Sequence, residues 1–138
     1  PVVLPDRVDE NLLSWLAAQR LQVVMVIHCN HPNEIDAGLI EAMGRLKRAG
    51  VVLLNQSVLL RNINDEAATL IKLSERLFAA GVLPYYLHQL DRVQGAAHFE
   101  VDARIARKLI DEVSASLPGY LVPRLVQEIP GMQGKTPL

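Results

Sequence analysis

Short apolar runs alternate along this chain with longer segments whose apolar residues recur at helical spacing. The short runs are rich in β-branched and aliphatic residues and predict strands at residues 23–27, 51–54 and 82–87. The longer segments predict helices at residues 6–19, 34–49, 65–80 and 102–116. A weaker final strand is expected at residues 120–123 or 125–126.

The boundaries of two helices carry capping signals. Asn33 and Asn64 are expected to cap the helices that follow them, and Gly50 and Gly81 are expected to end those helices. The continuous apolar run at residues 23–27 predicts a strand that is buried on both faces of a parallel sheet.

The order of these elements indicates the fold class. The strands begin near residues 23, 51 and 82, so one strand–helix unit occurs roughly every thirty residues. This spacing is typical of right-handed βαβ crossovers, and we therefore predict an α/β fold with a parallel sheet. Because no change in composition marks a linker, residues 1–138 are expected to form a single domain.

Composition and charge narrow the functional classes. The 14 basic and 15 acidic residues nearly cancel, and the densest basic cluster, Arg45-x-Lys47-Arg48, is too small to indicate nucleic acid binding. The apolar runs are too short to predict a membrane-spanning helix. The single cysteine cannot form an internal disulfide, which fits a cytoplasmic location, and it cannot by itself hold an iron–sulfur cluster.

Polar side chains follow each predicted strand. They are His28-Cys29-Asn30-His31, then Asn55-Gln56-Ser57, then His88-Gln89-Leu90-Asp91, and finally Glu128 after the last apolar run. In parallel α/β folds the chemistry gathers at the carboxyl ends of the strands, so a site at this edge is favoured. Each residue taken alone has another explanation, because polar side chains at strand ends also satisfy exposed backbone groups.

A lysine and two acids near these positions suggest a further kind of site. Lys135 lies in a glycine-containing loop bracketed by Pro130 and Pro137, where the backbone can approach a ligand closely. Such a lysine can form a Schiff base with an aldehyde cofactor, although a solvated lysine near a chain end has the same pattern. Asp91 and Glu128 would form a paired anionic site for an ammonium group if both reach one pocket, and each could instead be a helix cap or a surface acid.

A metal site is the least favoured interpretation. His28 and His31 could act as ligands, with Asp91, His88 or His98 completing the shell. Two histidines three positions apart in a loop do not form a strong zinc signature, so the sequence predicts no metal site and a metal hydrolase is kept only as a third alternative.

Longer motifs extend along the whole chain. They occupy residues 1–5, 28–35, 54–60, 64–65, 84–86, 116–123 and 134–137, together with Asp91, Gly95, His98 and Phe99. In these motifs the sequence resembles the lysine 2,3-aminomutase family of radical S-adenosylmethionine enzymes. Residues 84–88, 93–99 and 135–138 resemble the branch of this family that prepares β-lysine for elongation factor P.

The resemblance implies a fold, an activity and cofactors. It implies a partial (β/α) barrel of about three consecutive βα units, the carboxy-terminal half of a radical S-adenosylmethionine barrel. The parent enzyme would convert L-α-lysine to β-lysine with pyridoxal phosphate, S-adenosylmethionine and a 4Fe–4S cluster. The three cluster cysteines are absent from this chain, so the isolated chain is expected to be inactive.

The resemblance also implies roles for particular residues. Lys135 is similar to the lysine that binds pyridoxal phosphate, and Asp91 and Glu128 are similar to the two acids that hold the ε-ammonium group of lysine. His28 and Gln56 are similar to residues of the cofactor pocket.

Two differences from the free-standing lysine aminomutases bear on the substrate. Met132 and Gln133 interrupt the glycine run before the lysine, and Glu128 stands where those enzymes carry an aspartate. Both changes suit the elongation factor P branch, and they leave lysine and related diamino acids open as substrates.

The alternative to an aminomutase is a small, non-catalytic α/β domain that binds a ligand or partner. Unpaired strand edges would favour a homo-oligomer.

Overall fold

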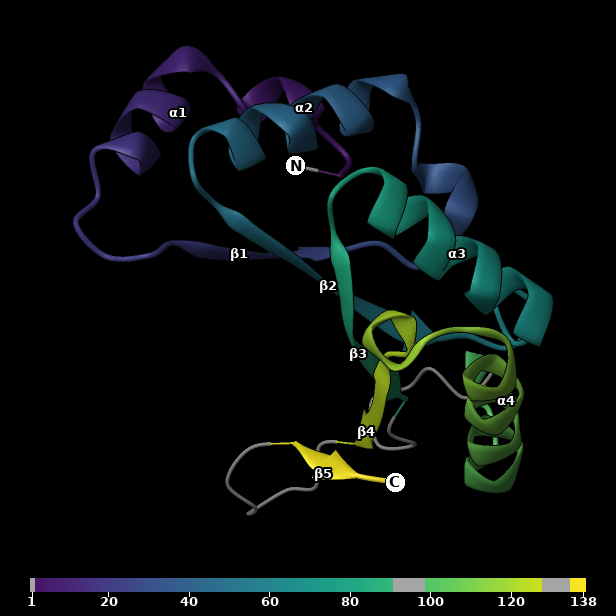
Figure 1. Ribbon diagram of the computed structural model, residues 1–138. Helices are drawn as coiled ribbons and strands as arrows, with labels where there is room; N and C mark the ends of the chain where they lie inside the picture. Colours follow the sequence, from purple (N-terminus) through teal and green to yellow (C-terminus); the bar gives the residue numbers. More distant parts are fainter. Residues whose placement is uncertain (1, 91–98, 128–134) are drawn as a thin grey trace.

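The computed structural model describes residues 2–90, 99–127 and 135–138, and it shows helices packed on one face of a twisted sheet (Figure 1). The strands are β1 (Val24–His28), β2 (Val52–Leu59), β3 (Leu83–Gln89), β4 (Arg124–Gln127) and β5 (Thr136–Pro137). The helices are α1 (Glu10–Ala17), α2 (Ala37–Arg48), α3 (Ala67–Ala79) and α4 (Ala103–Ser116). Short 3-10 helices are η1 (Pro5–Arg7), η2 (Pro32–Glu34) and η5 (Gly119–Leu121).

The described strands form one sheet in the order β1-β2-β3-β4-β5. The strands β1 to β4 pair in parallel, and β5 pairs antiparallel with the end of β4. The predicted α/β fold with consecutive βα units is therefore confirmed. The sequence did not predict β5, because a strand of two residues is too short to carry a periodic pattern.

Two apolar clusters join the helices to the sheet. The first lies between α1, α2 and the strands β1 and β2, and it includes Ile27, Leu39, Met43, Leu46 and Leu53. The second lies between α3, α4 and the strands β2 to β4, and it includes Leu59, Leu70, Leu87, Val113 and Leu125. Both clusters lie on the same side of the sheet, because strands joined in sequence order by right-handed crossovers carry all their helices on one face.

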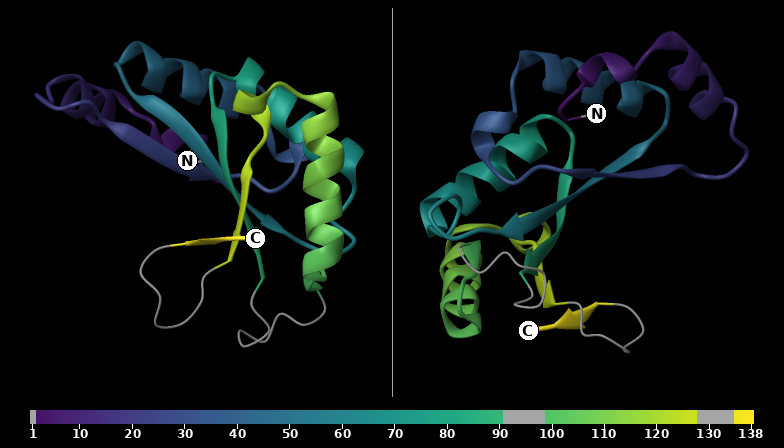
Figure 2. Two further views of the ribbon diagram at one scale, coloured as in Figure 1. Left: turned by 60° about the horizontal axis from the view of Figure 1, so that its bottom comes forward. Right: turned by 180° about the vertical axis from the view of Figure 1, so that it is seen from behind.

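The other face of the sheet, which we call the open face, is covered by no described helix (Figure 2). On it Val24 is 52% exposed, Val52 41% and Val26 36%. The prediction that the first strand is buried on both faces is therefore wrong. A continuous apolar run is typical of a strand buried on both faces, but it does not show which faces the helices of this chain cover.

Two helix caps differ from the prediction. α2 begins after Asp36, whose Oδ1 accepts a hydrogen bond of 2.8 Å from the backbone N–H of Leu39, whereas Asn33 lies in η2. α3 begins after Glu66, and Asn64 instead accepts a hydrogen bond from the backbone at the end of β2. Asparagine side chains bind any suitable backbone group nearby, so their presence alone does not locate a helix start.

The second and third strands extend beyond their predicted ends. Asn55, Gln56 and Ser57 lie inside β2, and His88 lies inside β3, although they were expected to follow these strands. Strand pairing uses backbone groups, so polar side chains do not end a strand whose neighbours continue the ladder. The final strand is β4, which confirms the second of the two predicted positions.

The first and last helices follow the predicted helical pattern. α4 confirms the helix predicted at residues 102–116, and its buried face includes Ala106, which is fully buried, whereas Ile105 is 53% exposed. α1 is shorter than predicted, because the chain first forms η1. Within the described ranges, no helix has the length and apolar character needed to cross a membrane.

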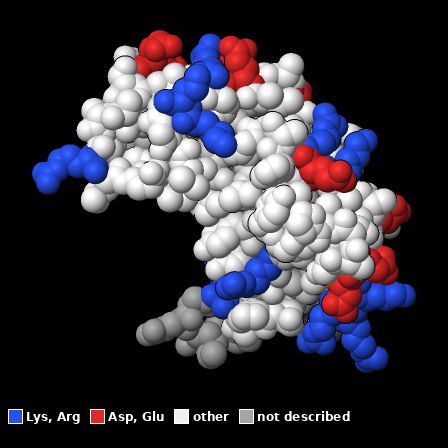
Figure 3. Space-filling model, in the orientation of Figure 1, with Lys and Arg blue, Asp and Glu red and all other residues white. Residues whose placement is uncertain are grey.

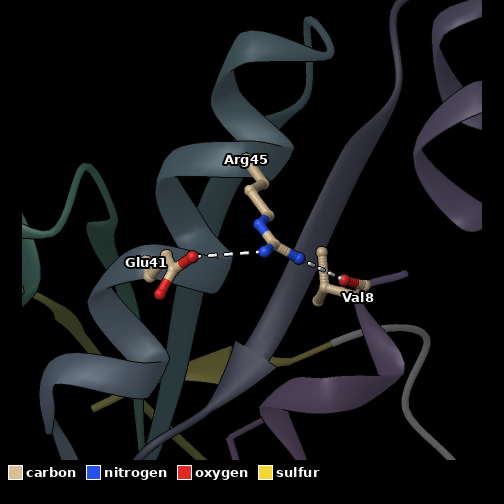
Figure 4. A network of polar contacts seen from close by, with 3 residues as sticks. All are labelled: Val8, Glu41 and Arg45. Carbon is tan, nitrogen blue, oxygen red and sulfur yellow. Dashed lines mark hydrogen bonds and ion pairs between the residues drawn. The ribbon is translucent and has the colours of Figure 1, made fainter. Parts of the chain in front are cut away.

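Arg45 on α2 ties the η1 segment to the rest of the fold (Figure 4). Its Nη1 donates to the backbone oxygen of Val8 at 3.3 Å, and its Nη2 donates to Oε1 of Glu41 at 3.2 Å. Val8 itself is buried in the first apolar cluster. The ion pair with Glu41 is solvent-exposed and contributes little, so the packing of Val8 holds this segment.

Gly50 and Gly81 end α2 and α3 with φ angles of +89° and +85°, which confirms their predicted role. We expect Gly50→Ala to lower the free energy of unfolding by about 1–2 kcal/mol in a urea titration, because an L-residue is strained in this conformation. The new Cβ would meet no atom within 4 Å, so strain is the only cost. Gly119→Ala is the matched control, since its Cβ also meets nothing within 4 Å and its φ is not in the left-handed region. Equal losses in both variants would contradict this explanation.

Candidate functional site

The strand register brings four polar side chains into one line across the open face. His28 on β1 pairs with Gln56 on β2, Gln56 pairs with Tyr86 on β3, and Tyr86 pairs with Arg124 on β4. Adjacent strands lie about 4.8 Å apart, so side chains in one register line are direct neighbours. We call these four residues the polar row. They come from positions almost one hundred residues apart in the sequence, and only the sheet places them together.

Lys135 lies next to the polar row. It directly precedes β5, which pairs with the end of β4. Its Nζ is 5.6 Å from the centroid of the Tyr86 ring, a distance at which an ammonium group is attracted by the ring face. The tail lysine that the sequence singled out therefore lies beside an aromatic ring in the centre of the sheet.

Gln56 is oriented by a histidine from the next strand. Gln56 Oε1 and His88 Nε2 are 3.2 Å apart. When His88 carries its proton on Nε2, the ring donates to Gln56 Oε1, and Gln56 presents its NH₂ group away from His88. The His88 ring also meets Tyr86 edge-on, with ring centroids 5.9 Å apart. His88 thus contacts both Gln56 and Tyr86, two members of the polar row.

A bulge in β3 adds a second tyrosine to this region. The register between β2 and β3 shifts by one residue at Gln56, which leaves Tyr85 without a partner on β2. The rings of Tyr85 and Tyr86 have centroids 3.9 Å apart. The hydrogen bond between these two side chains raises the pKa of Tyr85, and the nearby charge of Arg124 acts in the opposite direction. Tyr85 therefore remains a neutral phenol at physiological pH.

The described part of the open face carries basic but not acidic side chains. No Asp or Glu occurs in the five strands that the structure describes. Figure 3 shows the surface hollowed on this side, with basic side chains of the described residues at the lower margin of the hollow. Within the described residues Arg124 forms no ion pair, so its guanidinium is able to meet an anionic group of a ligand.

Three of the predicted site residues lie on this face. Lys135 and Gln56 are partly buried, and His28 is exposed at the end of β1. Asp91 and Glu128 lie outside the described residues, so the predicted ammonium site remains a prediction. The structure thus places on one face the lysine and the two residues, His28 and Gln56, for which the resemblance implies a cofactor pocket.

The residues of the proposed metal site are partly engaged in other contacts. His31 caps η2, where its Nδ1 accepts a hydrogen bond of 3.1 Å from the backbone N–H of Asn33. Among the residues that the structure describes, no group of three His, Cys, Asp or Glu side chains could hold a metal ion. Asp91 and His98, which the metal hypothesis also used, lie outside these residues.

Two members of the polar row, Tyr86 and Arg124, had no role predicted from the sequence. Tyr86 lies within a matched motif, and this position was the available signal for it. Arg124 carried no local signal, because its place beside Tyr86 follows from the pairing of β3 with β4. His88 was predicted to lie at the end of the third strand and was considered as a possible metal ligand, and the structure shows it in contact with Gln56.

Cys29 directly follows His28, the member of the polar row on β1, and it lies on the helix side of the sheet. It is 0% exposed, and its Sγ donates to the backbone oxygen of His31 at 3.5 Å. Burial raises the pKa of the Cys29 thiol to about 12, and the charge of Glu34 adds to this effect. The thiolate, which is the form that binds metals and reacts, is therefore not formed at neutral pH.

We expect native Cys29 to resist alkylation by iodoacetamide at neutral pH and to react fully once the chain is unfolded, as mass spectrometry would show. The thiol has an ordinary pKa of 9.0 when unfolded and about 12 when folded. The unfolded state therefore loses its proton first, and stability falls as the pH rises through this interval. Cys29→Ala should remove this part of the pH dependence in urea titrations. Rapid labelling of the native chain would contradict the prediction.

Curated relatives match along the whole chain. The chain is 54% identical over 138 residues to L-lysine 2,3-aminomutase of Escherichia coli (strain K12), a match that covers 100% of the chain and 40% of that protein. It is 50% identical over 136 residues to the protein of the same name from Haemophilus influenzae, covering 99% and 40%. It is 39% identical over 138 residues to L-lysine 2,3-aminomutase of Clostridium subterminale, a match that covers 100% of the chain and 33% of that protein. The chain thus spans about 40% or less of the length of these relatives.

No model of a known protein family matches the chain. Among solved structures, the fold is similar to that of a radical SAM methyltransferase from Sphaerobacter thermophilus, with a TM-score of 0.57 and 16% sequence identity. This match covers 85% of the chain and 37% of that protein, and at such an identity it concerns the fold alone.

Proposed function

We propose that Lys135 holds pyridoxal phosphate for an aminomutase reaction. The proposal starts from the predicted resemblance, which is confirmed, since proteins named L-lysine 2,3-aminomutase match the whole chain. In a protein of the relatives' full length, this reaction would convert L-α-lysine to β-lysine for the modification of elongation factor P. The position of Lys135 on the open face, with its Nζ 5.6 Å from the Tyr86 ring centroid, is the observation that carries the proposal.

The side chains around Lys135 fit such a cofactor. The cofactor requires a primary amine for attachment, an apolar or aromatic surface for its ring, and cationic or N–H groups for its phosphate. The described residues offer Lys135, the ring of Tyr86, the amide group of Gln56 and the guanidinium of Arg124. When bound, pyridoxal phosphate would carry the migrating amino group. This chain contributes its attachment point and the groups that orient it.

The other cofactors of the proposed reaction do not fit this chain alone. The sequence holds one cysteine, Cys29, which is buried with a raised pKa, whereas a 4Fe–4S cluster needs several thiolates. We therefore propose that S-adenosylmethionine and the cluster bind mainly to parts of a full-length protein that lie outside these residues, with His28 contributing to the cofactor pocket. On this proposal the chain by itself has no aminomutase activity.

We further propose that Asp91 and Glu128 bind the ε-ammonium group of the substrate. In the sequence, Asp91 follows β3 and Glu128 directly follows β4, the two strands that carry Tyr86 and Arg124. Two carboxylates at these positions would supply the anionic groups that the described strands do not carry. The substrate is then lysine or a related diamino acid, which has an ammonium group at one end and a carboxylate at the other.

The exposed apolar side chains of the open face support one further proposal. Val24, Val26 and Val52 would be covered if additional strands continued the sheet from β1 into a barrel, as in a protein of the relatives' length. A second copy of the chain could cover the same face, which would make the protein a homo-oligomer. In the non-catalytic alternative, this face would bind another partner.

We propose a cytoplasmic location, in keeping with the single buried thiol.

We expect the purified chain, mixed with pyridoxal phosphate and reduced with borohydride, to carry the pyridoxyl group on Lys135. Mass spectrometry of peptides would locate it. Lys135→Ala should lose this labelling, and Lys108→Ala, which removes an exposed lysine of α4, should retain it. The reason is that only Lys135 lies beside the polar row.

Labelling spread evenly over the surface lysines, or unchanged in Lys135→Ala, would contradict the proposed role of Lys135. If labelling of Lys135 appears only when the chain is extended to the relatives' length, the missing groups lie in the added residues and the role of Lys135 stands.

A further inference from the structure

The carboxyl ends of β1 and β2 are joined by buried polar side chains. Asn55 is 1% exposed, and its carboxamide binds both sides of the residue that follows β1. Its Oδ1 accepts from the backbone N–H of Cys29 at 2.9 Å, and its Nδ2 donates to the backbone oxygen of Cys29 at 3.0 Å. Ser57 Oγ donates to the same oxygen at 2.9 Å and accepts from Asn55 Nδ2 at 3.0 Å. All of these atoms lie on the helix side of the sheet.

A second set of bonds holds the next residue. Asn30 Oδ1 accepts from the backbone N–H of Val58 at 2.9 Å. Asn64, which is also 1% exposed, donates from Nδ2 to the backbone oxygens of Asn30 at 2.8 Å and Val58 at 2.9 Å. Its Oδ1 accepts from the backbone N–H of Leu60 at 2.7 Å. We call Asn30, Asn55, Ser57 and Asn64 the asparagine clamp.

The clamp accounts for where β1 ends. β1 stops at His28, opposite Gln56, while β2 continues to Leu59. Beyond His28 the side chain of Asn30 takes the Val58 N–H, and the clamp turns the chain toward the helix side, where Cys29 is fully buried. His28 is therefore the last residue of β1 on the open face, and its pairing with Gln56 is fixed by bonds that lie on the other side of the sheet.

We propose that Asn30, Asn55, Ser57 and Asn64 are positioning residues that hold His28 beside Gln56 on the open face. Glu34 completes the arrangement, since its Oε1 accepts from the backbone N–H groups of Asn30 at 2.7 Å and His31 at 3.0 Å. With these bonds the backbone polar groups of the turn have defined partners, and a fully bonded buried network selects a single conformation.

The network satisfies backbone groups that no apolar side chain could satisfy. Apolar side chains at these positions would leave the N–H groups of Cys29 and Val58 without these partners, and each buried orphaned group costs roughly 1–3 kcal/mol. The hydrogen bonds therefore stabilise the turn and also fix its direction. The inference rests on the proposed function only for the ligand that His28 and Gln56 would meet, and the clamp itself is tested without any ligand.

Replacing asparagine by aspartate should disrupt the clamp at one position and leave it intact at another. Asn30→Asp keeps an oxygen acceptor for the Val58 N–H, and no described bond uses the Asn30 amide nitrogen. Asn64→Asp replaces a donor with a carboxylate oxygen that faces two backbone oxygens. In NMR spectra of the full chain we expect Asn64→Asp to accelerate hydrogen exchange at Val58 and Leu60 by roughly tenfold or more, and to shift or split the imidazole signals of His28. Asn30→Asp should leave both close to the native values.

Controls separate positioning from general loss of structure. Asn33→Asp adds the same negative charge at an exposed side chain in the loop that contains Asn30. It should change neither the hydrogen exchange of Val58 and Leu60 nor the imidazole signals of His28. The indole signal of Trp15, the single tryptophan, reports on α1 and should remain native in all variants. Ser57→Ala, which removes one hydroxyl, should shift His28 in the same direction by a smaller amount, and it serves as the test if Asn64→Asp does not fold.

Two results would overturn the inference. Equal effects of Asn30→Asp and Asn64→Asp would show that the donor and acceptor pattern is not what holds the turn. Faster exchange at Val58 with unchanged His28 signals would show that the clamp supports the strand but does not position His28. Neither result depends on whether Lys135 binds pyridoxal phosphate.

Discussion

Right-handed crossovers between strands that follow one another in sequence order place every helix of this chain on the same face of the sheet. This constraint decides where the two apolar clusters form and leaves the open face to carry other side chains. Once the helices are on one side, alternation along each strand assigns every residue to the core or to the open face. The polar row and the exposed valines therefore have a common origin in the handedness of the chain.

Because of the same alternation, three consecutive residues of β2 make contacts on different faces of the sheet. Asn55 and Ser57 point to the helix side and bind the turn after β1, while Gln56 points to the open face and meets His88. A substitution at one of these positions acts on one face directly and on the other through the backbone. The clamp and the candidate site are thus two sides of one strand, and the polar network on the buried side fixes the geometry of the exposed side.

The relation to the aminomutases gives these features a chemical context. A lysine beside an aromatic ring, a carboxamide with a fixed orientation and a guanidinium without an acidic partner among the described residues form a surface suited to an anionic, aromatic cofactor. The single buried thiol excludes this chain alone as the holder of an iron–sulfur cluster. Under the proposed function, these residues would bind and orient the cofactor, and residues of a protein of the relatives' length would supply the radical chemistry.

The sequence by itself determined the local features of this protein. The periods of the apolar residues located the helices and most strands, and Gly50 and Gly81 marked two helix ends because only their backbones tolerate the required φ without strain. The motifs also named His28, Gln56 and Lys135, but they could not show that these residues share one face or that Tyr86 and Arg124 join them. The tertiary structure decided those points, together with the single covered face of β1 and the roles of Asn55 and Asn64. The physical reason is that strand register and crossover handedness relate residues far apart in the chain, whereas the sequence pattern records only what lies within a few turns or one strand.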